Sequence, residues 1–245
     1  MQTQEPQLSG KVAIVTGAGR GIGRAIALAY ARQGAAVCCA ARSLGEVQET
    51  AARIVAEGGR AIAVSTDVAD FASVERTVDE ATEAFGGLDI VIVNAGVGGG
   101  KVPIEESDPQ TWRTTIEVNL VGAYHCARAA IPALKRRGGG KIVTVGSGLG
   151  QRAMAGVSDY ACSKAGLWML TRGLAQELAP YGISVNQLIP GPVVTQMTGT
   201  QMAQNTFEGE WAKTPEDVVP LAVFLATQPE PGPTGQNFSL MRRDA

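Results

Sequence analysis

Four polar residues in the middle of the chain have side chains suited to acid-base chemistry: Asn119, Ser147, Tyr160 and Lys164. Tyr160 and Lys164 are four positions apart, so on a helix they share one face and point into the same space. A free phenol has a pKa of about 10, and proton transfer near neutrality requires that pKa to fall by roughly three units. We expect the Lys164 ammonium to supply much of this shift. The same spacing also arises by chance from composition, so the pair alone does not distinguish chemistry from packing. Together with the residues described next, it indicates that Tyr160 is a general acid and base assisted by Lys164.

Ser147 and Asn119 extend this group. Ser147 ends an apolar run and can donate a hydrogen bond to a substrate carbonyl, which stabilises developing alkoxide charge. Asn119 is polar among apolar neighbours and is a candidate to hold a water that links Lys164 to solvent. A hydrolase using Ser147 and Lys164 is an open alternative, although VGSGLG lacks the outer glycines of a nucleophile elbow. The single histidine, His125, is interpreted as a packing or interface residue, and no metal site is predicted.

A glycine-rich turn indicates a second kind of site. The stretch TGAGRGIGRA, residues 16–25, follows a predicted strand and opens a predicted helix. Glycine permits positive φ and close backbone approach, and a helix N-terminus offers free N–H groups to a pyrophosphate. The alternative is a turn that only joins strand to helix. The context favours a dinucleotide-binding turn.

The end of the second predicted strand bears on which dinucleotide binds. A carboxylate there would accept hydrogen bonds from the ribose hydroxyls of NAD, but the sequence has Ala41 followed by Arg42. Arg42 and Arg20, which lies in the glycine turn, can hold a 2′-phosphate in charge-assisted hydrogen bonds. Each could instead be a solvated surface arginine. Together they favour NADP(H).

These residues are positioned by an alternation of strands and helices. Apolar, β-branched runs typical of buried parallel strands occur at 11–16, 35–41, 61–66, 88–94, 140–145 and 183–189, with a last short strand near 237–240. Helical patterns lie near 22–33, 45–57, 71–85, 108–136, 157–180 and 215–227. Plausible helix starts are Asp70, Ser73, Asp108 and Thr214. The alternation predicts one α/β domain over residues 1–245, a doubly wound parallel sheet that binds ligands at the carboxyl ends of its strands.

Composition excludes several function classes. With 45% hydrophobic and 18% charged residues and a net charge of −2, the chain has no footprint for nucleic acid. Its N-terminus lacks the features of a secretory signal, and its most apolar stretch, residues 25–41, is interrupted by Arg32 and Gly34. We expect a cytoplasmic protein that does not bind a membrane. The cysteines are predicted to be buried free thiols: Cys38, Cys39, Cys126 and Cys162.

The Thr-Gly-x-x-x-Gly-Ile-Gly turn, together with Asn119, Ser147, Tyr160 and Lys164 in order, resembles the short-chain dehydrogenase/reductase family. The resemblance covers residues 10 to about 240 and looks most like its 3-oxoacyl-carrier-protein reductase branch. It implies a Rossmann-type sheet of about seven strands in the order 3-2-1-4-5-6-7 with helices on both faces. The family frequently has Ser where Gly146 stands, and the tail MRRDA departs from its usual ending.

The resemblance also assigns further residues to the cofactor. Asp67 and Val68 match an adenine-contacting pair, although Asp67 reads equally well as a turn former. NAG at 94–96 matches the turn after the fourth strand, and the Pro190-Gly191 segment would lie under the nicotinamide. The predicted cofactor-binding residues are Gly17, Gly19, Arg20, Gly21, Ile22, Gly23, Arg42, Asp67, Val68, Asn94, Ala95, Gly96, Tyr160, Lys164, Pro190, Gly191, Val193 and Thr195.

The implied activity is hydride transfer between NADP(H) and a carbonyl or secondary alcohol, with NADPH-dependent reduction of a ketone or 3-oxoacyl group as the favoured direction. A non-catalytic protein of the same fold that senses nucleotide or acts as a scaffold is the alternative. The resemblance also implies a substrate lid near 196–212. It further implies a homotetramer, with a dimer as alternative, paired through the helices at 108–136 and 157–180.

Overall fold

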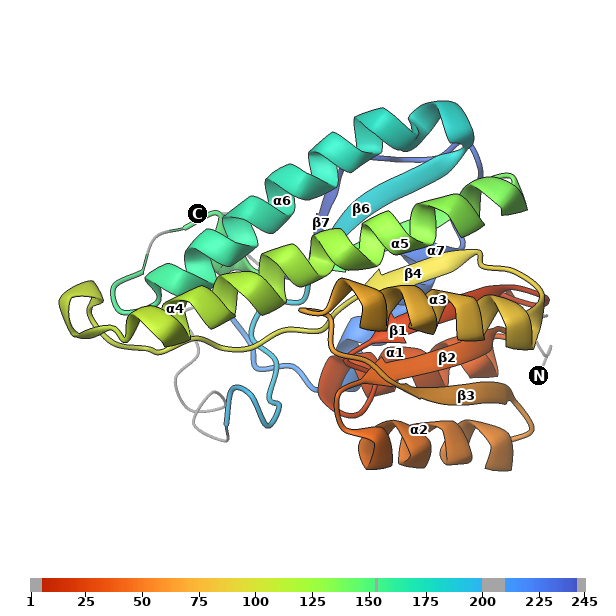
Figure 1. Ribbon diagram of the computed structural model, residues 1–245, viewed down its shortest axis with the longest axis horizontal. Helices are drawn as coiled ribbons and strands as arrows, with labels where there is room; N and C mark the ends of the chain where they lie inside the picture. Colours follow the sequence, from red (N-terminus) through yellow and green to blue (C-terminus); the bar gives the residue numbers. More distant parts are fainter. Residues whose placement is uncertain (1–5, 153, 200–209, 242–245) are drawn as a thin grey trace.

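The computed structural model describes residues 6–152, 154–199 and 210–241 and has one seven-stranded sheet at its centre (Figure 1). The strands run in the order β3-β2-β1-β4-β5-β6-β7, and every neighbouring pair is parallel. Their bounds are β1 Val12–Thr16, β2 Ala36–Ala41, β3 Arg60–Ser65, β4 Ile90–Val93, β5 Gly140–Val145, β6 Ile183–Ile189 and β7 Asn237–Ser239. The predicted fold class and strand order are confirmed.

Helices cover both faces of the sheet. The helices are α1 Gly21–Arg32, α2 Leu44–Ala56, α3 Phe71–Phe85, α4 Pro109–Ile116, α5 Gly122–Arg137, α6 Ser158–Leu178 and α7 Val219–Ala226. One apolar cluster joins α1, α2 and α7 to the sheet, and the other joins α3, α5 and α6 to the opposite face. Because successive strand residues point to opposite faces, Cys38 belongs to one cluster and its neighbour Cys39 to the other.

Three of the four predicted helix starts are confirmed. Asp70 accepts a hydrogen bond from the Ala72 N–H, and Asp108 accepts from the first turn of α4. Thr214 begins a capping box that opens the short 3-10 turn Pro215–Val218 before α7. Ser73 is not a start: it is buried within the first turn of α3, where its hydroxyl accepts from the Asp67 N–H.

The helix predicted over 108–136 is confirmed, since α4 and α5 form one continuous helical stretch. The sequence did not predict the π-helical turn, Glu117–Val121, that lies between them. The side chain of Asn119, inside that turn, bonds the backbone of the loop after β4 through both its amide oxygen and nitrogen. Such wide turns are frequent at functional sites.

The prediction of four buried thiols is wrong for Cys162, which is exposed, while Cys38, Cys39 and Cys126 are buried. Cys162 lies on α6, where Ser163 and Lys164 occupy the buried face, so position 162 points away from the sheet. Within the ranges that the structure describes, no helix has both the length and the apolar character needed to cross a membrane.

Candidate active site

A cavity of about 740 Å³ opens at the carboxyl ends of the strands, around the point between β1 and β4 where strand order reverses. It runs from the turn before α1 to the start of α6. The predicted site residues that line it are Gly17, Gly19, Arg20, Gly21, Ile22, Arg42, Val68, Asn94, Ala95, Gly96, Ser147, Tyr160, Lys164, Pro190, Gly191, Val193 and Thr195. The structure therefore brings nearly all of them together, as expected for a parallel α/β sheet.

Three predicted site residues do not line the cavity: Gly23, Asp67 and Asn119. The Asp67 carboxylate accepts a hydrogen bond from the Ala69 N–H, so in this structure it forms a turn, while its neighbour Val68 faces the cavity. Gly23 has a packing role, because a Cβ there would lie 2.2 Å from the carbonyl oxygen of Gly17. Glycine at position 23 thus lets α1 approach the end of β1.

The turn before α1 has the features of an anion site. Gly17 has a φ of +68°, a conformation that side chains disfavour. The side chain of Arg20 does not cap α1, and the first turn of that helix contains no acidic residue. The N–H groups at this end are therefore not engaged by a capping carboxylate and can bind a phosphate.

Thr16 and Asn94 fix the two central strands to each other beside this turn. The Thr16 hydroxyl donates to the Ile92 carbonyl over 3.1 Å and accepts from the Asn94 N–H over 2.9 Å. The Asn94 amide in turn donates to the Thr16 carbonyl over 2.8 Å. This reciprocal bonding holds the ends of β1 and β4 in fixed positions at the cavity floor.

Ser147 and Tyr160 meet at the other end of the cavity. Ser147 directly follows β5 and the glycine Gly146, and its Oγ accepts from the Leu149 N–H over 3.2 Å. Burial raises the pKa of Tyr160 above its ordinary value, and a hydrogen bond with Ser147 opposes that rise. The sequence predicted a lowered pKa caused by Lys164. The structure shows the opposite direction, because the enclosing protein disfavours the charged phenolate.

Lys164 is buried one helical turn beyond Tyr160. Its Nζ donates to the Val145 carbonyl over 2.9 Å and lies 5.6 Å from the centre of the Tyr160 ring. Burial lowers the pKa of Lys164 to about 8. The Val145 carbonyl thus holds the ammonium on the side of the cavity where the Tyr160 ring lies.

Asn119 stands behind this pair. Its Oδ1 accepts from the Val97 N–H over 2.8 Å, and its Nδ2 donates to the Val97 carbonyl and to Ser163 Oγ, each over 3.0 Å. A Cβ on Gly96 would lie 3.1 Å from Asn119 Oδ1 and 3.8 Å from Lys164 Nζ, so both side chains approach this glycine. The role of Asn119 in holding a water stays a prediction.

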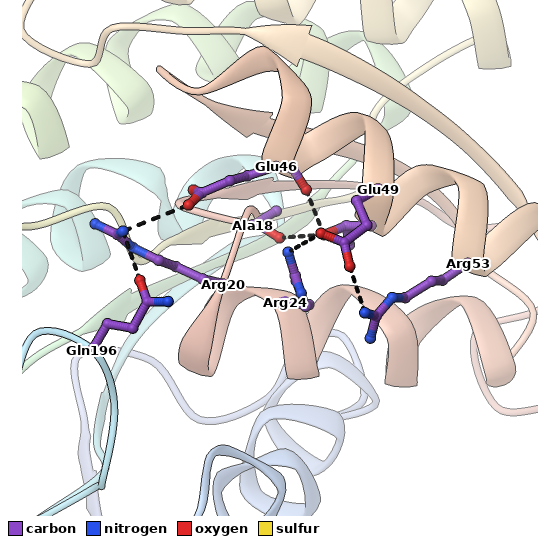
Figure 2. A network of polar contacts seen from close by, with 8 residues as sticks. Ala18, Arg20, Arg24, Glu46, Glu49, Arg53 and Gln196 are labelled. Atoms are coloured by element: carbon purple, nitrogen blue, oxygen red, sulfur yellow. Dashed lines mark hydrogen bonds and ion pairs between the residues drawn. The ribbon is translucent and has the colours of Figure 1, made fainter. Parts of the chain in front are cut away.

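The arginines lie at the mouth of the cavity. Arg42, directly after β2, lines it, and so does Arg20. Figure 2 shows the Arg20 guanidinium directed toward Gln196, to which it donates over 2.8 Å, and toward Glu46, 3.6 Å away. Both cations can therefore reach one end of the cavity, opposite the Tyr160 end.

The segment after β6 closes one side of the cavity. Pro190, Gly191, Val193 and Thr195 line it, and Thr195 Cγ2 lies 3.4 Å from the position of a Cβ on Gly21. Val193 forms an isolated parallel bridge with Lys213, which joins the two ends of the intervening stretch. Most of the predicted lid at 196–212 lies outside the described residues, since 200–209 are not described.

Sequence reasoning missed Asp159, the residue before Tyr160. This buried carboxylate accepts from the Tyr160 N–H over 2.7 Å, from the Gly100 N–H over 2.9 Å and from the Thr115 hydroxyl over 3.1 Å. It thereby connects α6 to the loop after β4 and to α4, which lies beside the start of α6 (Figure 1). An acid in a first helical turn is a common feature, so its position gave no distinct signal.

Gln187 and Met241 were also missed. Gln187 of β6 is buried beneath Gly146, where it fills the space of a side chain. The sulfur of Met241 lies 2.4 Å from the position that a Cβ on Gly148 would take. Both contacts join segments distant in sequence, and no local pattern indicates them.

Comparison with known proteins gives a consistent result. A family model described as short chain dehydrogenase matches residues 11–206. The chain is 40% identical over 228 residues to cis-4-hydroxycyclohexanecarboxylate dehydrogenase of Sinomonas cyclohexanicum, covering 89% of each chain. It is 33% identical over 239 residues to 3-oxoacyl-(acyl-carrier-protein) reductase of Synechocystis, covering 95% of this chain and 96% of that one. A crystal structure of a short-chain type dehydrogenase/reductase from Mycobacterium marinum superposes with a TM-score of 0.88 at 32% identity, covering 97% and 96% of the two chains.

Proposed function

Because the chain belongs to the short chain dehydrogenase family, it is an oxidoreductase, and we propose that it reduces a ketone to a secondary alcohol with NADPH. The observation that carries the proposal is the meeting of Ser147, Tyr160 and Lys164 at one end of a cavity whose other end is the glycine turn. A hydrolase using Ser147 and Lys164 would leave that turn and Arg42 without a role.

The residues at the Tyr160 end divide the acid-base work. NADPH, when bound, supplies the hydride. Ser147 donates a hydrogen bond to the substrate carbonyl oxygen and stabilises negative charge on it. Tyr160 donates its phenol proton to the same oxygen. Burial keeps the phenol protonated before the transfer. The positive charge of the neighbouring Lys164 favours the phenolate and so helps the phenol to release its proton.

Lys164 stabilises the negative charge that remains on Tyr160 after the proton transfer. Its buried ammonium, 5.6 Å from the centre of the Tyr160 ring, stabilises the phenolate electrostatically. The Val145 carbonyl and the helix fix the ammonium in place, so little reorganisation accompanies the transfer. Asn119, bonded to Val97 and Ser163, holds the neighbouring backbone and is the proposed anchor of a water that returns a proton to Lys164.

The positive charge of the arginines at the end of the cavity opposite Tyr160 supports binding of NADP(H) over NAD(H). Ala41 ends β2 where an acid would select for free ribose hydroxyls, and Arg42 follows it. Arg42 and Arg20 both line the cavity at this end. Two guanidiniums there are suited to a 2′-phosphate, for which they offer charged donors in a planar array.

The cavity walls favour a medium-sized, moderately apolar substrate. Leu149, Met154 and Met197 line the cavity together with Gly98. The two relatives named above act, by their names, on a hydroxylated cyclohexane carboxylate and on a 3-oxoacyl thioester. Cyclic ketones and 3-oxoacyl thioesters are therefore the first two substrate classes to test.

We also propose a homotetramer, with a dimer as the alternative. The outer faces of α5 and α6 carry exposed apolar side chains, including Tyr124 and Met169, the latter 62% exposed. Light scattering on the eluting protein distinguishes the two states, and a monomer at micromolar concentration would contradict both.

The decisive assay follows the loss of NADPH absorbance with a panel of ketones, 3-oxoacyl thioesters and aldehydes. Wild type should consume NADPH with at least one of them. Tyr160→Phe should lower the rate by about 10²- to 10⁴-fold while NADPH binding persists, since only the proton donor is removed. Tyr181→Phe, at an exposed tyrosine just after α6, is the matched control. Tight NADPH binding with no turnover on any carbonyl would instead favour the nucleotide-sensing alternative.

A further inference from the structure

Three side chains from three separate elements meet at the arginine end of the cavity (Figure 2). Arg20 comes from the glycine turn, Glu46 from the first turn of α2, and Gln196 from the segment after β6. Arg20 Nη1 lies 3.6 Å from Glu46 Oε1 and donates to Gln196 Oε1 over 2.8 Å. One of the two cations proposed for a 2′-phosphate is thus already engaged by an acid.

Glu46 lies within the cavity wall and against the phosphate turn. It lines the cavity together with Arg42 and Arg20. A Cβ on Gly19 would lie 2.8 Å from Glu46 Cβ and 2.9 Å from its Oε2. The carboxylate is therefore packed against the backbone that would receive the dinucleotide, in the part of the cavity where the arginines are found.

We propose that Glu46 is a specificity-determining residue that weakens binding of a 2′-phosphorylated dinucleotide while leaving NADH binding largely unchanged. The inference rests on the proposed function. A phosphate held by Arg20 shares that guanidinium with Glu46 and lies close to the carboxylate, whose like charge opposes it. A dinucleotide with free ribose hydroxyls brings no such charge. Glu46 thus reduces the preference for NADPH that Arg20 and Arg42 create.

The chain offers a matched control on the same helix. Glu49 lies in the next turn of α2 and pairs with Arg24 over 3.2 Å and with Arg53, and it does not line the cavity. Glu46 and Glu49 are both substantially exposed, at 35% and 50% of their side chains. Glu46→Gln and Glu49→Gln therefore remove the same charge from the same helix, at positions inside and outside the cavity.

The experiment titrates the full-length wild type, Glu46→Gln and Glu49→Gln with NADPH and, separately, with NADH, and measures dissociation constants by nucleotide fluorescence. Glu46→Gln should tighten NADPH binding by roughly two- to fivefold, with NADH changed by less and Glu49→Gln matching wild type. The gain should shrink in high salt. Weaker NADH binding with NADPH unchanged would overturn the proposal, since Glu46 would then bind ribose hydroxyls. Equal effects on both nucleotides, or on both variants, would overturn it as well.

These results separate the inference from the proposed function. If wild type binds both nucleotides and Glu46→Gln changes neither, only the role of Glu46 fails. If wild type binds neither nucleotide, the proposed function fails and the inference with it.

Discussion

The side chain of Gln187 occupies the space that any side chain at position 146 would need. A Cβ on Gly146 would lie 2.4 Å from Cδ and 2.6 Å from Oε1 of Gln187, which is only 1% exposed. Gly146 immediately precedes Ser147 at the end of β5. A side chain at position 146, beside the proposed active-site serine, would therefore have to displace the buried amide of Gln187 on the neighbouring strand.

We accordingly expect Gly146→Ser to lower the free energy of unfolding by about 1–3 kcal/mol, because the core next to Ser147 becomes overpacked. Adding Gln187→Ala should recover most of that loss, since the larger side chain is removed together with a buried amide nitrogen that has no hydrogen-bond partner among the described residues. Urea unfolding of both single variants and the double variant measures the coupling. Gly45→Ser is the control, because a Cβ there meets nothing within 4 Å. Additive effects would contradict the packing argument.

Asp159→Asn should lower both stability and turnover. Each carboxylate oxygen accepts from an N–H group, so either orientation of the amide brings its NH₂ against a backbone donor. We expect a loss of about 1–3 kcal/mol in unfolding free energy. We also expect kcat to fall about 10-fold or more as the start of α6 shifts, with KM changed less.

Thr115→Val tests which part of the Asp159 network matters. It removes the hydroxyl bond to the carboxylate and the bond of the same hydroxyl to the Thr111 carbonyl, but leaves both N–H bonds to Asp159, so a smaller effect on kcat is expected. If Asp159→Asn loses stability but keeps its kcat, Asp159 serves the fold alone and does not position Tyr160.

Arg42→Asp should invert the nucleotide preference. The change removes a guanidinium from the cavity and places a carboxylate where ribose hydroxyls are recognised in NAD-binding sheets. NADPH should bind about 10- to 100-fold more weakly, and NADH should bind as well as before or better. Dissociation constants for both nucleotides check this. An unchanged ratio would refute a role for Arg42 in selection.

The pH dependence of stability should report on Lys164. Burial lowers its pKa to about 8 in the folded protein, against about 10.5 for an exposed lysine. Between these values the unfolded chain binds more protons than the folded one, so stability rises with pH. At pH 7 the buried charge costs stability, and this cost disappears as pH rises through 8 toward 10.5. Relative to Lys164→Met, wild type should therefore gain up to about 3 kcal/mol over that range. Parallel pH profiles for the two proteins would contradict a buried, destabilised ammonium.

The sequence was sufficient to predict the sheet because each strand is a short apolar run between helices, and parallel strands buried on both faces carry that pattern. The general rule that ligands bind at the carboxyl ends of parallel strands placed the cavity, and the family resemblance supplied the strand order. The convergence of Ser147, Tyr160 and Lys164 follows from that topology.

The features that the sequence did not predict are contacts between residues from separate elements. They are the packing of Gln187 against Gly146, the ion pair of Arg20 with Glu46 and the three hydrogen bonds accepted by Asp159. The direction of the pKa shift at Tyr160 likewise depends on how much protein encloses the phenol. Spacing along the chain placed Lys164 near it but gave no measure of burial.

The π-helical turn at Glu117–Val121 sets the rotation of α4 about the helix axis relative to α5. An α-helix advances about 100° per residue, so the extra residue sets the angle between the face that α4 offers to α6 and the face that α5 offers to the sheet. Deleting one residue from the turn would leave composition and length almost untouched. It would nevertheless rotate Thr115 and its helix by about 100° relative to Cys126. A redesign of this helix must therefore assign buried and exposed positions separately in α4 and in α5.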